Sequence, residues 1–184
     1  MADSYRVLGV DPGSRVTGFG LIEVSGRRLT YVASGAISSA ASFALERRLL
    51  SIFEGLTRII RVHAPTVLSV EDVFYAQNVR SAITLGHARG AALVAACHAG
   101  LLVRAYSTAE IKMTVAGSGR AEKAQVQQMV RAILSLPEIP GPDAADALAA
   151  AICHAQHAAM LARIPAAERR GSHRGAARRA GAAP

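Results

Sequence analysis

The sequence predicts an α/β protein with a mixed five-stranded sheet and helices packed on both faces of that sheet. Three apolar stretches, residues 7–10, 17–24 and 29–37, follow one another with short turns between them, which is typical of antiparallel strands. Two further apolar stretches, residues 66–70 and 101–106, each follow a helical pattern, which is typical of parallel strands. The chain therefore begins as an antiparallel sheet and continues in helix-strand units.

The predicted helices have their own periodicity or their own start signals. Residues 42–62 place apolar side chains at steps of three and four, with charged side chains on the other side, and Ala64 and Pro65 end this helix. Gly141 and Pro142 mark the start of the last helix. Further helices are predicted over residues 81–99, 108–115, 121–134 and 143–161.

Length and charge predict one folded domain and a basic tail. A chain of 184 residues with 51% hydrophobic residues can bury a substantial single core. The net charge of +8 is uneven, because residues 163–184 carry six arginines against one glutamate and almost no large apolar residues. We expect a domain over residues 1–162 and a disordered tail over 163–184, which is either a weak arm for polyanions or a solvated extension without a specific role.

The cysteines and the apolar stretches predict a soluble, cytoplasmic protein. Cys97 and Cys153 lie in Ala-rich helical contexts without a CxxC partner, so we expect both to be reduced thiols in the core. No stretch reaches the roughly 20 apolar residues that a membrane span needs, and the first residues show no charged-then-apolar targeting pattern.

Four acidic residues occupy the ends of predicted elements. Asp11 follows the first apolar strand and Glu71 follows the fourth, so the two meet in one crevice if these strands are neighbours. Asp143 and Asp146 are three residues apart on a helix and share one face near its start. Each also has an ordinary structural explanation, since aspartates form turns after strands and cap helices.

The combination of these acids indicates metal chemistry. Carboxylates brought together repel one another and raise their own pKa values unless cations share the site. Mg²⁺ is the natural partner of such an oxygen cluster, and two ions about 4 Å apart can activate water and stabilise a leaving oxygen. A site without cysteine argues against structural zinc. We therefore predict metal-dependent phosphodiester cleavage with two Mg²⁺ per site, Mn²⁺ being an alternative.

Several motifs, taken in their order along the chain, resemble those of a known protein family. The order VLGVDPGSRVTGFG, SVEDVF, SAITLGHARGAAL, KMTVAGSGRAEKAQVQQMV and PDAADALAAAICHA closely resembles the RuvC family of Holliday junction resolvases, which belong to the ribonuclease H-like superfamily. The resemblance covers residues 5–160 and implies a ribonuclease H-like fold. It matches Asp11, Glu71, Asp143 and Asp146 to the family's four catalytic, metal-binding acids, although some members have histidine at the position of Asp143.

The resemblance also implies a function and partners. It implies a homodimer that binds a four-way DNA junction and makes symmetric nicks in two strands of like polarity. The products would be 5′-phosphate and 3′-hydroxyl ends that ligase can join, in homologous recombination and DNA repair. Family members act with the branch-migration proteins RuvA and RuvB.

Basic residues around a glycine break predict DNA contacts. Lys112 and Lys123 are the two lysines of a chain with nineteen arginines, and they flank residues 117–119. A solvated surface would explain one of them, but two lysines beside a flexible segment fit phosphate contact, and both match DNA-contacting lysines of the family. Arg120 and Arg80 are further candidates for phosphate contact.

Five more positions are weighed between a functional and a structural interpretation. Phe74 matches the family's loop aromatic and is predicted to stack on an unpaired base, the alternative being packing on the sheet. Gly86 and Gly90 are predicted at the dimer interface, where small residues let helices approach, although they also suit packing on the chain's own sheet. His154 and His157 are interpreted as structural or surface residues, because His157 lies about 16 Å along the helix from Asp146.

Three other functions are considered from the sequence. Another ribonuclease H-like nuclease, acting on RNA–DNA hybrids, would need substrate assays to be distinguished. An actin-like nucleotide-binding protein also has a strand, Asp-x-Gly, strand pattern, but it needs two lobes and a second glycine-rich loop that 184 residues do not provide. A non-catalytic junction binder would leave the four acids without a purpose.

Overall fold

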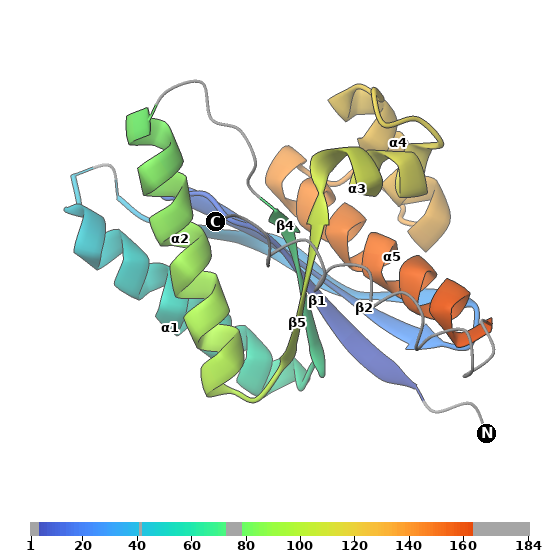
Figure 1. The fold of residues 1–184 in the computed structure, drawn as a ribbon, viewed down its shortest axis with the longest axis horizontal. Helices are drawn as coiled ribbons and strands as arrows, with labels where there is room; N and C mark the ends of the chain where they lie inside the picture. The colour runs from blue at the N-terminus through green and yellow to red at the C-terminus, as the bar shows by residue number, and fades with distance from the viewer. Residues whose placement is uncertain (1–3, 41, 73–78, 164–184) are drawn as a thin grey trace, which may run out of the picture.

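The computed structural model describes residues 4–40, 42–72 and 79–163 of the chain. A five-stranded sheet divides the molecule, with the strand order β3-β2-β1-β4-β5 (Figure 1). The neighbours β1, β2 and β3 run antiparallel, whereas β4 and β5 run parallel to β1. The strands are β1 (Tyr5–Asp11), β2 (Val16–Ser25), β3 (Arg28–Ser38), β4 (Val67–Asp72) and β5 (Leu102–Ser107). This confirms the predicted mixed sheet, with the first and fourth strands as neighbours.

Helices cover both faces of the sheet. In Figure 1, α1 and α2 lie on one side, and α3, α4 and α5 lie on the other. Their bounds are α1 (Leu45–His63), α2 (Val79–His98), α3 (Thr108–Ala116), α4 (Lys123–Leu134) and α5 (Pro142–Arg163). None of the helices in the described ranges is long and apolar enough to cross a membrane.

The central strand β1 is buried from both sides, which explains its continuous apolar sequence. Val7 packs into a core with residues of α3, α4 and α5, whereas Leu8 and Val10 pack into a second core with residues of α1 and α2. All three side chains are fully buried. A strand covered on both faces has no polar side, so its sequence does not alternate.

Glycines in β1 and β2 let α5 lie directly on the sheet. A Cβ at Gly9 would collide with the main chain of Ala147, and one at Gly18 would collide with the main chain of Asp143. A Cβ at Gly20 would collide with the side chain and the amide nitrogen of Leu148. The absence of side chains at these positions therefore brings the first turns of α5 against the ends of β1 and β2.

Two expectations from the sequence are wrong in detail. The helix predicted from residue 42 begins at Leu45, because the amide of Phe43 donates to the carbonyl of Ala40 in a preceding turn and Ala44 is extended. Cys97 is exposed rather than in the core, whereas Cys153 is buried as predicted. The inward face of α2 is formed by Ala92, Ala95 and Ala96, which turns Cys97 to the outside.

Candidate active site

Two parallel strands bring Asp11 and Glu71 to the same edge of the sheet. The register pairs Val10 of β1 with Val70 of β4, so the next residues, Asp11 and Glu71, leave the two strands side by side. Asp11 is the last residue of β1, and Glu71 is the penultimate residue of β4. The apolar cores beneath these strands fix both main chains at this edge.

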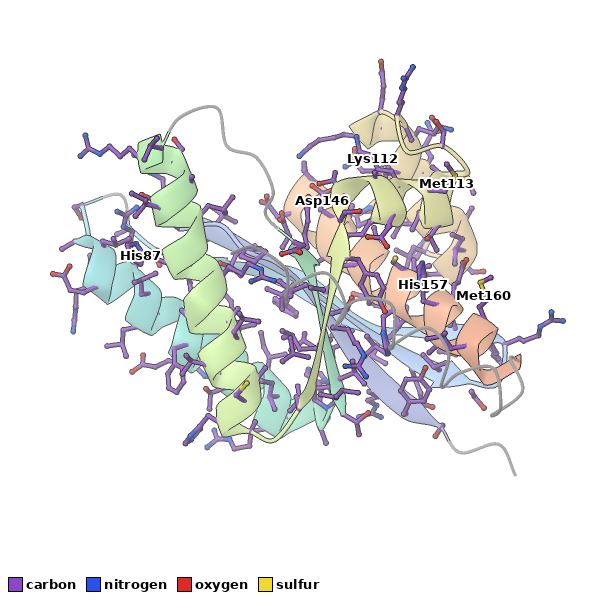
Figure 2. All side chains as sticks on the ribbon, viewed as in Figure 1. His87, Lys112, Met113, Asp146, His157 and Met160 are labelled. Atoms are coloured by element: carbon purple, nitrogen blue, oxygen red, sulfur yellow. The ribbon has the colours of Figure 1, made fainter. Side chains whose placement is uncertain are left out.

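The first turns of α5 bring two more acids to this edge. Asp143 and Asp146 lie in the first turns of α5, and both are half-buried. Asp146 lines a cavity of about 230 Å³ together with Asp11 and Glu71. The rest of the lining comes from α3, α4 and α5, namely Thr108, Ile111, Lys112, Lys123, Val126 and Ala149. Figure 2 places Asp146 of α5 and Lys112 of α3 near each other, above the ends of β4 and β5.

The Asp11 carboxyl is strongly perturbed by its surroundings. Burial first, and then the negative charges of Asp146, Glu71 and Asp143 in that order, together raise the pKa of Asp11 to about 7. The positive charge of Lys123 acts in the opposite direction. Four carboxyl groups thus share one electrostatic environment, although Asp143 does not line the cavity itself. This is the repulsion that the sequence predicted for converging acids.

Two of the acids have partners within the chain. Lys123 Nζ lies 3.1 Å from Asp146 Oδ2, and this ion pair raises the pKa of Lys123. The hydroxyl of Thr108 donates a hydrogen bond to Glu71 Oε1. Each partner offsets part of the negative charge at the cavity.

The chemistry of this donor set fits a hard divalent cation. The acids supply only oxygen ligands, and Asp11 lies against three like charges, which a cation would relieve. Within the described part of the chain, no three Asp, Glu, His or Cys side chains stand close enough together to form a ready metal site. Glu71 instead accepts a hydrogen bond from Thr108, and Asp146 pairs with Lys123, an ion pair that a bound cation would have to replace.

Two of the predicted DNA-contacting residues belong to the lining of this cavity. Lys112 and Lys123 line it. Arg120 is exposed in the segment between α3 and α4, and Arg80 is exposed in the first turn of α2. Phe74 lies outside the described residues.

The predicted interface glycines lie on the outward face of α2. At Gly86 and Gly90, no described atom lies within 4 Å of the place where a Cβ would stand. The alternative interpretation, close packing on the chain's own sheet, is therefore wrong for these two glycines. The exposed side chains of Val79, Ile83 and Val94 continue the same stripe at steps of three and four residues.

Two residues that the sequence interpretation missed contact the end of β4. Arg89 of α2 donates from Nε to the main-chain carbonyl of Glu71 over 3.2 Å, and its guanidinium lies 3.1 Å from Asp72. Thr108 contacts the Glu71 side chain. The pattern Ser107-Thr-Ala-Glu110 could have indicated the helix start that presents Thr108. No comparable signal marks Arg89.

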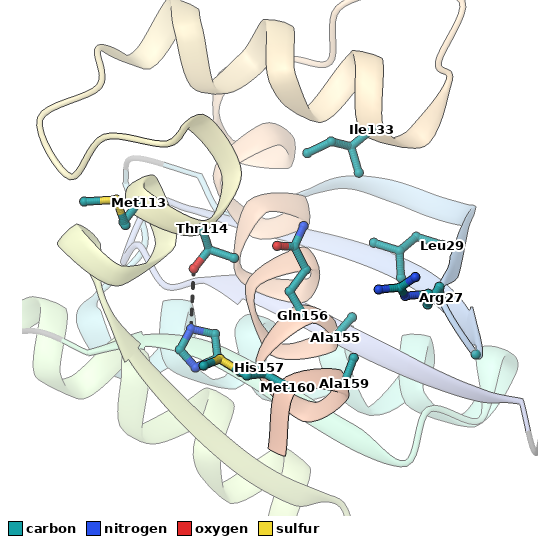
Figure 3. A pocket seen from close by; sticks show the side chains of 11 residues that line it. Arg27, Leu29, Met113, Thr114, Ile133, Ala155, Gln156, His157, Ala159 and Met160 are labelled. Carbon is teal, nitrogen blue, oxygen red and sulfur yellow. Dashed lines mark hydrogen bonds between the residues drawn. The ribbon is translucent and has the colours of Figure 1, made fainter. Parts of the chain in front are cut away.

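A larger cavity of about 820 Å³ lies toward the other end of α5 and contains none of the four acids (Figure 3). Its lining includes His157, whose Nε2 lies 3.4 Å from the hydroxyl of Thr114. The neighbouring His154 is buried and shares a 2.8 Å hydrogen bond with the Tyr106 hydroxyl. Burial lowers the pKa of His154 to about 4. These contacts agree with the structural interpretation of both histidines.

Comparisons with known proteins agree with this geometry. A family model described as crossover junction endodeoxyribonuclease RuvC matches residues 7–154. A protein of that name from Geobacter sp. (strain M21) is 54% identical over 156 residues, covering 85% of this chain and 95% of the relative. The relative from Shewanella amazonensis is 54% identical over 148 residues, covering 80% of this chain and 85% of its own length.

Solved structures give the same result for the fold. T. thermophilus RuvC in complex with Holliday junction substrate matches with a TM-score of 0.80 and 35% identity, covering 85% of this chain and 96% of that chain. The yeast mitochondrial Holliday junction resolvase Ydc2 matches with a TM-score of 0.56 at 12% identity, which shows a shared fold.

Proposed function

This chain belongs to the RuvC family of crossover junction endodeoxyribonucleases, and we propose that it resolves four-way (Holliday) DNA junctions in homologous recombination and DNA repair. The family match over residues 7–154 is the observation that carries this proposal. The reaction is hydrolysis of a phosphodiester in each of two strands, which leaves 5′-phosphate and 3′-hydroxyl ends.

We assign the catalytic, metal-binding site to Asp11, Glu71, Asp143 and Asp146. The raised pKa of Asp11 among three other carboxylates supports this assignment, because repelling carboxylates at a cavity are what a divalent cation offsets. Mg²⁺ is the expected ion, two per site, with Mn²⁺ as a substitute. The chemistry that such ions supply when bound is activation of water and stabilisation of charge on the leaving oxygen.

The basic residues at the cavity bind and orient the DNA backbone in this proposal. Lys112 and Lys123 present ammonium groups to the phosphates beside the acids. Lys123 also offsets the charge of Asp146, so its ion pair with that residue would exchange for a phosphate when DNA arrives. Arg120 and Arg80 add exposed positive charge, and Phe74 is proposed to stack on a base at the crossover.

The active form is proposed to be a homodimer. Gly86 and Gly90, with the exposed apolar side chains beside them on α2, offer a surface that a second copy could approach closely. A two-fold dimer suits a nearly two-fold junction, because each subunit would cut one of the two strands. RuvA and RuvB are the proposed partner proteins, by family membership.

The remaining assignments follow from the same function. Residues 1–162 are proposed to form the nuclease domain. The basic residues of 163–184 are proposed to add sequence-independent attraction to phosphate. Since its substrate is chromosomal DNA, we place the protein in the bacterial cytoplasm.

The substitution Asp11→Asn tests the site. It keeps the size of the side chain but removes the charge, so we expect cleavage of a synthetic four-way junction to fall at least about 10³-fold, a loss of about 4 kcal/mol of transition-state stabilisation. Junction binding, measured by gel shift in Ca²⁺, should change less than about threefold. Parallel loss of binding and cleavage in a folded variant would contradict the metal-site role.

A matched control and a substrate panel complete this test. Glu23→Gln removes a carboxylate that pairs with Arg6 away from the cavity, and it should cleave as the wild type does. Junction, linear duplex and RNA–DNA hybrid are compared with and without divalent metal. Preferential cleavage of the hybrid would favour the other type of ribonuclease H-like nuclease instead.

A further inference from the structure

The main chain of Glu71 is held from two sides. The β4–β5 register pairs Glu71 with Tyr106, so the ladder fixes its position along the strand. Arg89 donates to the Glu71 carbonyl from the helical layer on the other side of the strand end. What these contacts leave undetermined is the direction of the Glu71 side chain.

The start of α3 is equally well fixed, and it lies next to Glu71. Ser107 is the last residue of β5, where it pairs with Asp72, and it caps α3. Its hydroxyl accepts from the amide of Glu110, while the Glu110 carboxylate accepts from the amide and hydroxyl of Ser107. These bonds lower the pKa of Glu110, so its capping carboxylate stays charged to a lower pH than that of an isolated glutamate. Thr108, the first residue of α3, is therefore presented at a defined place.

At that place the Thr108 hydroxyl donates to one oxygen of the Glu71 carboxylate, Oε1. Both residues line the cavity that also holds Asp11 and Asp146. Lys112 lies four residues further along α3, on the same face of the helix, and lines the same cavity. One face of α3 thus supplies a hydrogen bond to an acid and a positive charge beside it.

We propose that Thr108 is a positioning residue for Glu71, and that its hydrogen bond holds the carboxylate at the cavity and strengthens divalent-cation binding there. This inference rests on the proposed metal role of the four acids. A glutamate loses rotamer freedom when it ligates an ion, and a partner that orders the side chain beforehand reduces that loss. Because a hydroxyl engages one carboxylate oxygen, the second oxygen stays available to a ligand.

The test compares Thr108→Val, which keeps the shape and removes the hydroxyl, with Thr108→Ser, which keeps the hydroxyl. Mn²⁺ binding to the DNA-free protein is measured by electron paramagnetic resonance and by calorimetry. Loss of such a supporting contact typically weakens metal binding by about tenfold or more, so we expect Thr108→Val to weaken it about tenfold. Thr108→Ser should stay within about twofold of the wild type.

Thr66→Val is the matched control. Thr66 is also exposed, but it directly precedes β4, at the opposite end of this strand from Glu71. It should bind Mn²⁺ as the wild type does. In cleavage assays, Thr108→Val should raise the Mn²⁺ concentration for half-maximal rate about tenfold, while KM for junction at saturating metal stays unchanged. Thr108 is exposed, so the variants are expected to fold, and Thr108→Ala provides a second variant without the hydroxyl.

Unchanged or tighter Mn²⁺ binding by both Thr108→Val and Thr108→Ala would overturn the proposal, since Thr108 would then be neutral or would compete with the ion. Weaker binding shared by Thr108→Ser would overturn it too, because the hydroxyl would not be the cause. If the wild type fails to cut junctions while Thr108→Val still weakens Mn²⁺ binding, the positioning role stands and the proposed function fails.

Discussion

At the scale of single residues, the ionisation of Asp11 makes the stability of the fold depend on pH and on a bound cation. Its pKa is raised from 3.8 to about 7, first by burial and then by Asp146, Glu71 and Asp143. Between these two pH values the folded protein keeps a proton that the unfolded chain has already released. The metal-free fold is therefore destabilised as pH rises through this window, and a bound cation would favour the ionised form.

The prediction at this scale is that the metal-free protein loses stability between about pH 4 and pH 7 because of Asp11. Since each pH unit in the window contributes about 1.4 kcal/mol, the effect is at most about 4 kcal/mol. Asp11→Asn should raise the melting temperature in EDTA at pH 8 and have little effect at pH 4. Thermal unfolding across this pH range measures it. An equal shift at both pH values would show that the charge of Asp11 is not responsible.

At the scale of elements, the contact of α5 with β1 and β2 decides where Asp143 and Asp146 lie. Gly9 faces the main chain of Ala147, Gly18 faces that of Asp143, and neither position has room for a Cβ. The helix can approach the sheet this closely because the strands have no side chains there. A larger residue must move α5 away from the strand that carries Asp11.

Gly9→Ala is therefore predicted to lower the free energy of unfolding by about 3 kcal/mol, at the upper end of the usual cost of overpacking. Gly141→Ala is the control, because a Cβ at Gly141 meets no described atom within 4 Å. It should leave stability unchanged or raise it by up to about 1 kcal/mol. Urea unfolding measures both variants. A Gly9→Ala protein as stable as the control would mean that α5 does not pack as closely as described.

The elements themselves could be predicted because their signals are local. The apolar run before Asp11 and the one before Glu71 end at charged residues, and the structure has strands there with the expected neighbours. The start of α1 was predicted three residues early, because the turn at Phe43 depends on a backbone bond that no side chain announces. The exposure of Cys97 was predicted wrongly, because the two faces of an Ala-rich helix such as α2 differ little in hydrophobicity.

The sequence predicts those features of the candidate site that depend on where strands end and helices begin. The positions of Asp11 and Glu71 at one edge follow from strand order, and the roles of the four acids remain predictions. The ion pair of Lys123 with Asp146 and the hydrogen bond of Thr108 to Glu71 could not be predicted. Both depend on side-chain directions across elements that are far apart in the sequence.

At the scale of the whole molecule, the two helical layers form different surfaces, one at the acid cavity and one with an exposed apolar stripe. The layer of α3, α4 and α5 surrounds the acid cavity, with the first two supplying Lys112 and Lys123. The other layer contains α2, whose outward stripe of Val79, Ile83 and Val94 is exposed in the single chain. Arg89 connects α2 to the sheet, because it projects to the end of β4 that carries Glu71. A dimer formed through α2 would thus be connected to the strand end at the site by Arg89, in addition to the apolar core under α2.

The double substitution Gly86→Leu with Gly90→Leu tests that dimer. A Cβ at either position meets no described atom within 4 Å in its own chain, and both positions face outward, so the fold should persist while the leucines keep a second copy at a distance. Light scattering after gel filtration should show a dimer for the wild type and a monomer for the variant. Gln128→Leu, an exposed position on α4 in the opposite layer, should remain a dimer.

Loss of the dimer should also change the products, because a monomer holds one active site. On a supercoiled plasmid that extrudes a cruciform, paired cuts within one binding event give linear DNA, whereas single cuts relax the plasmid and remove the junction. We therefore expect the wild type and Gln128→Leu to produce mainly linear DNA and the double-leucine variant to produce mainly nicked circles. A double-leucine variant that stays dimeric and linearises the plasmid would place the interface elsewhere than on Gly86 and Gly90.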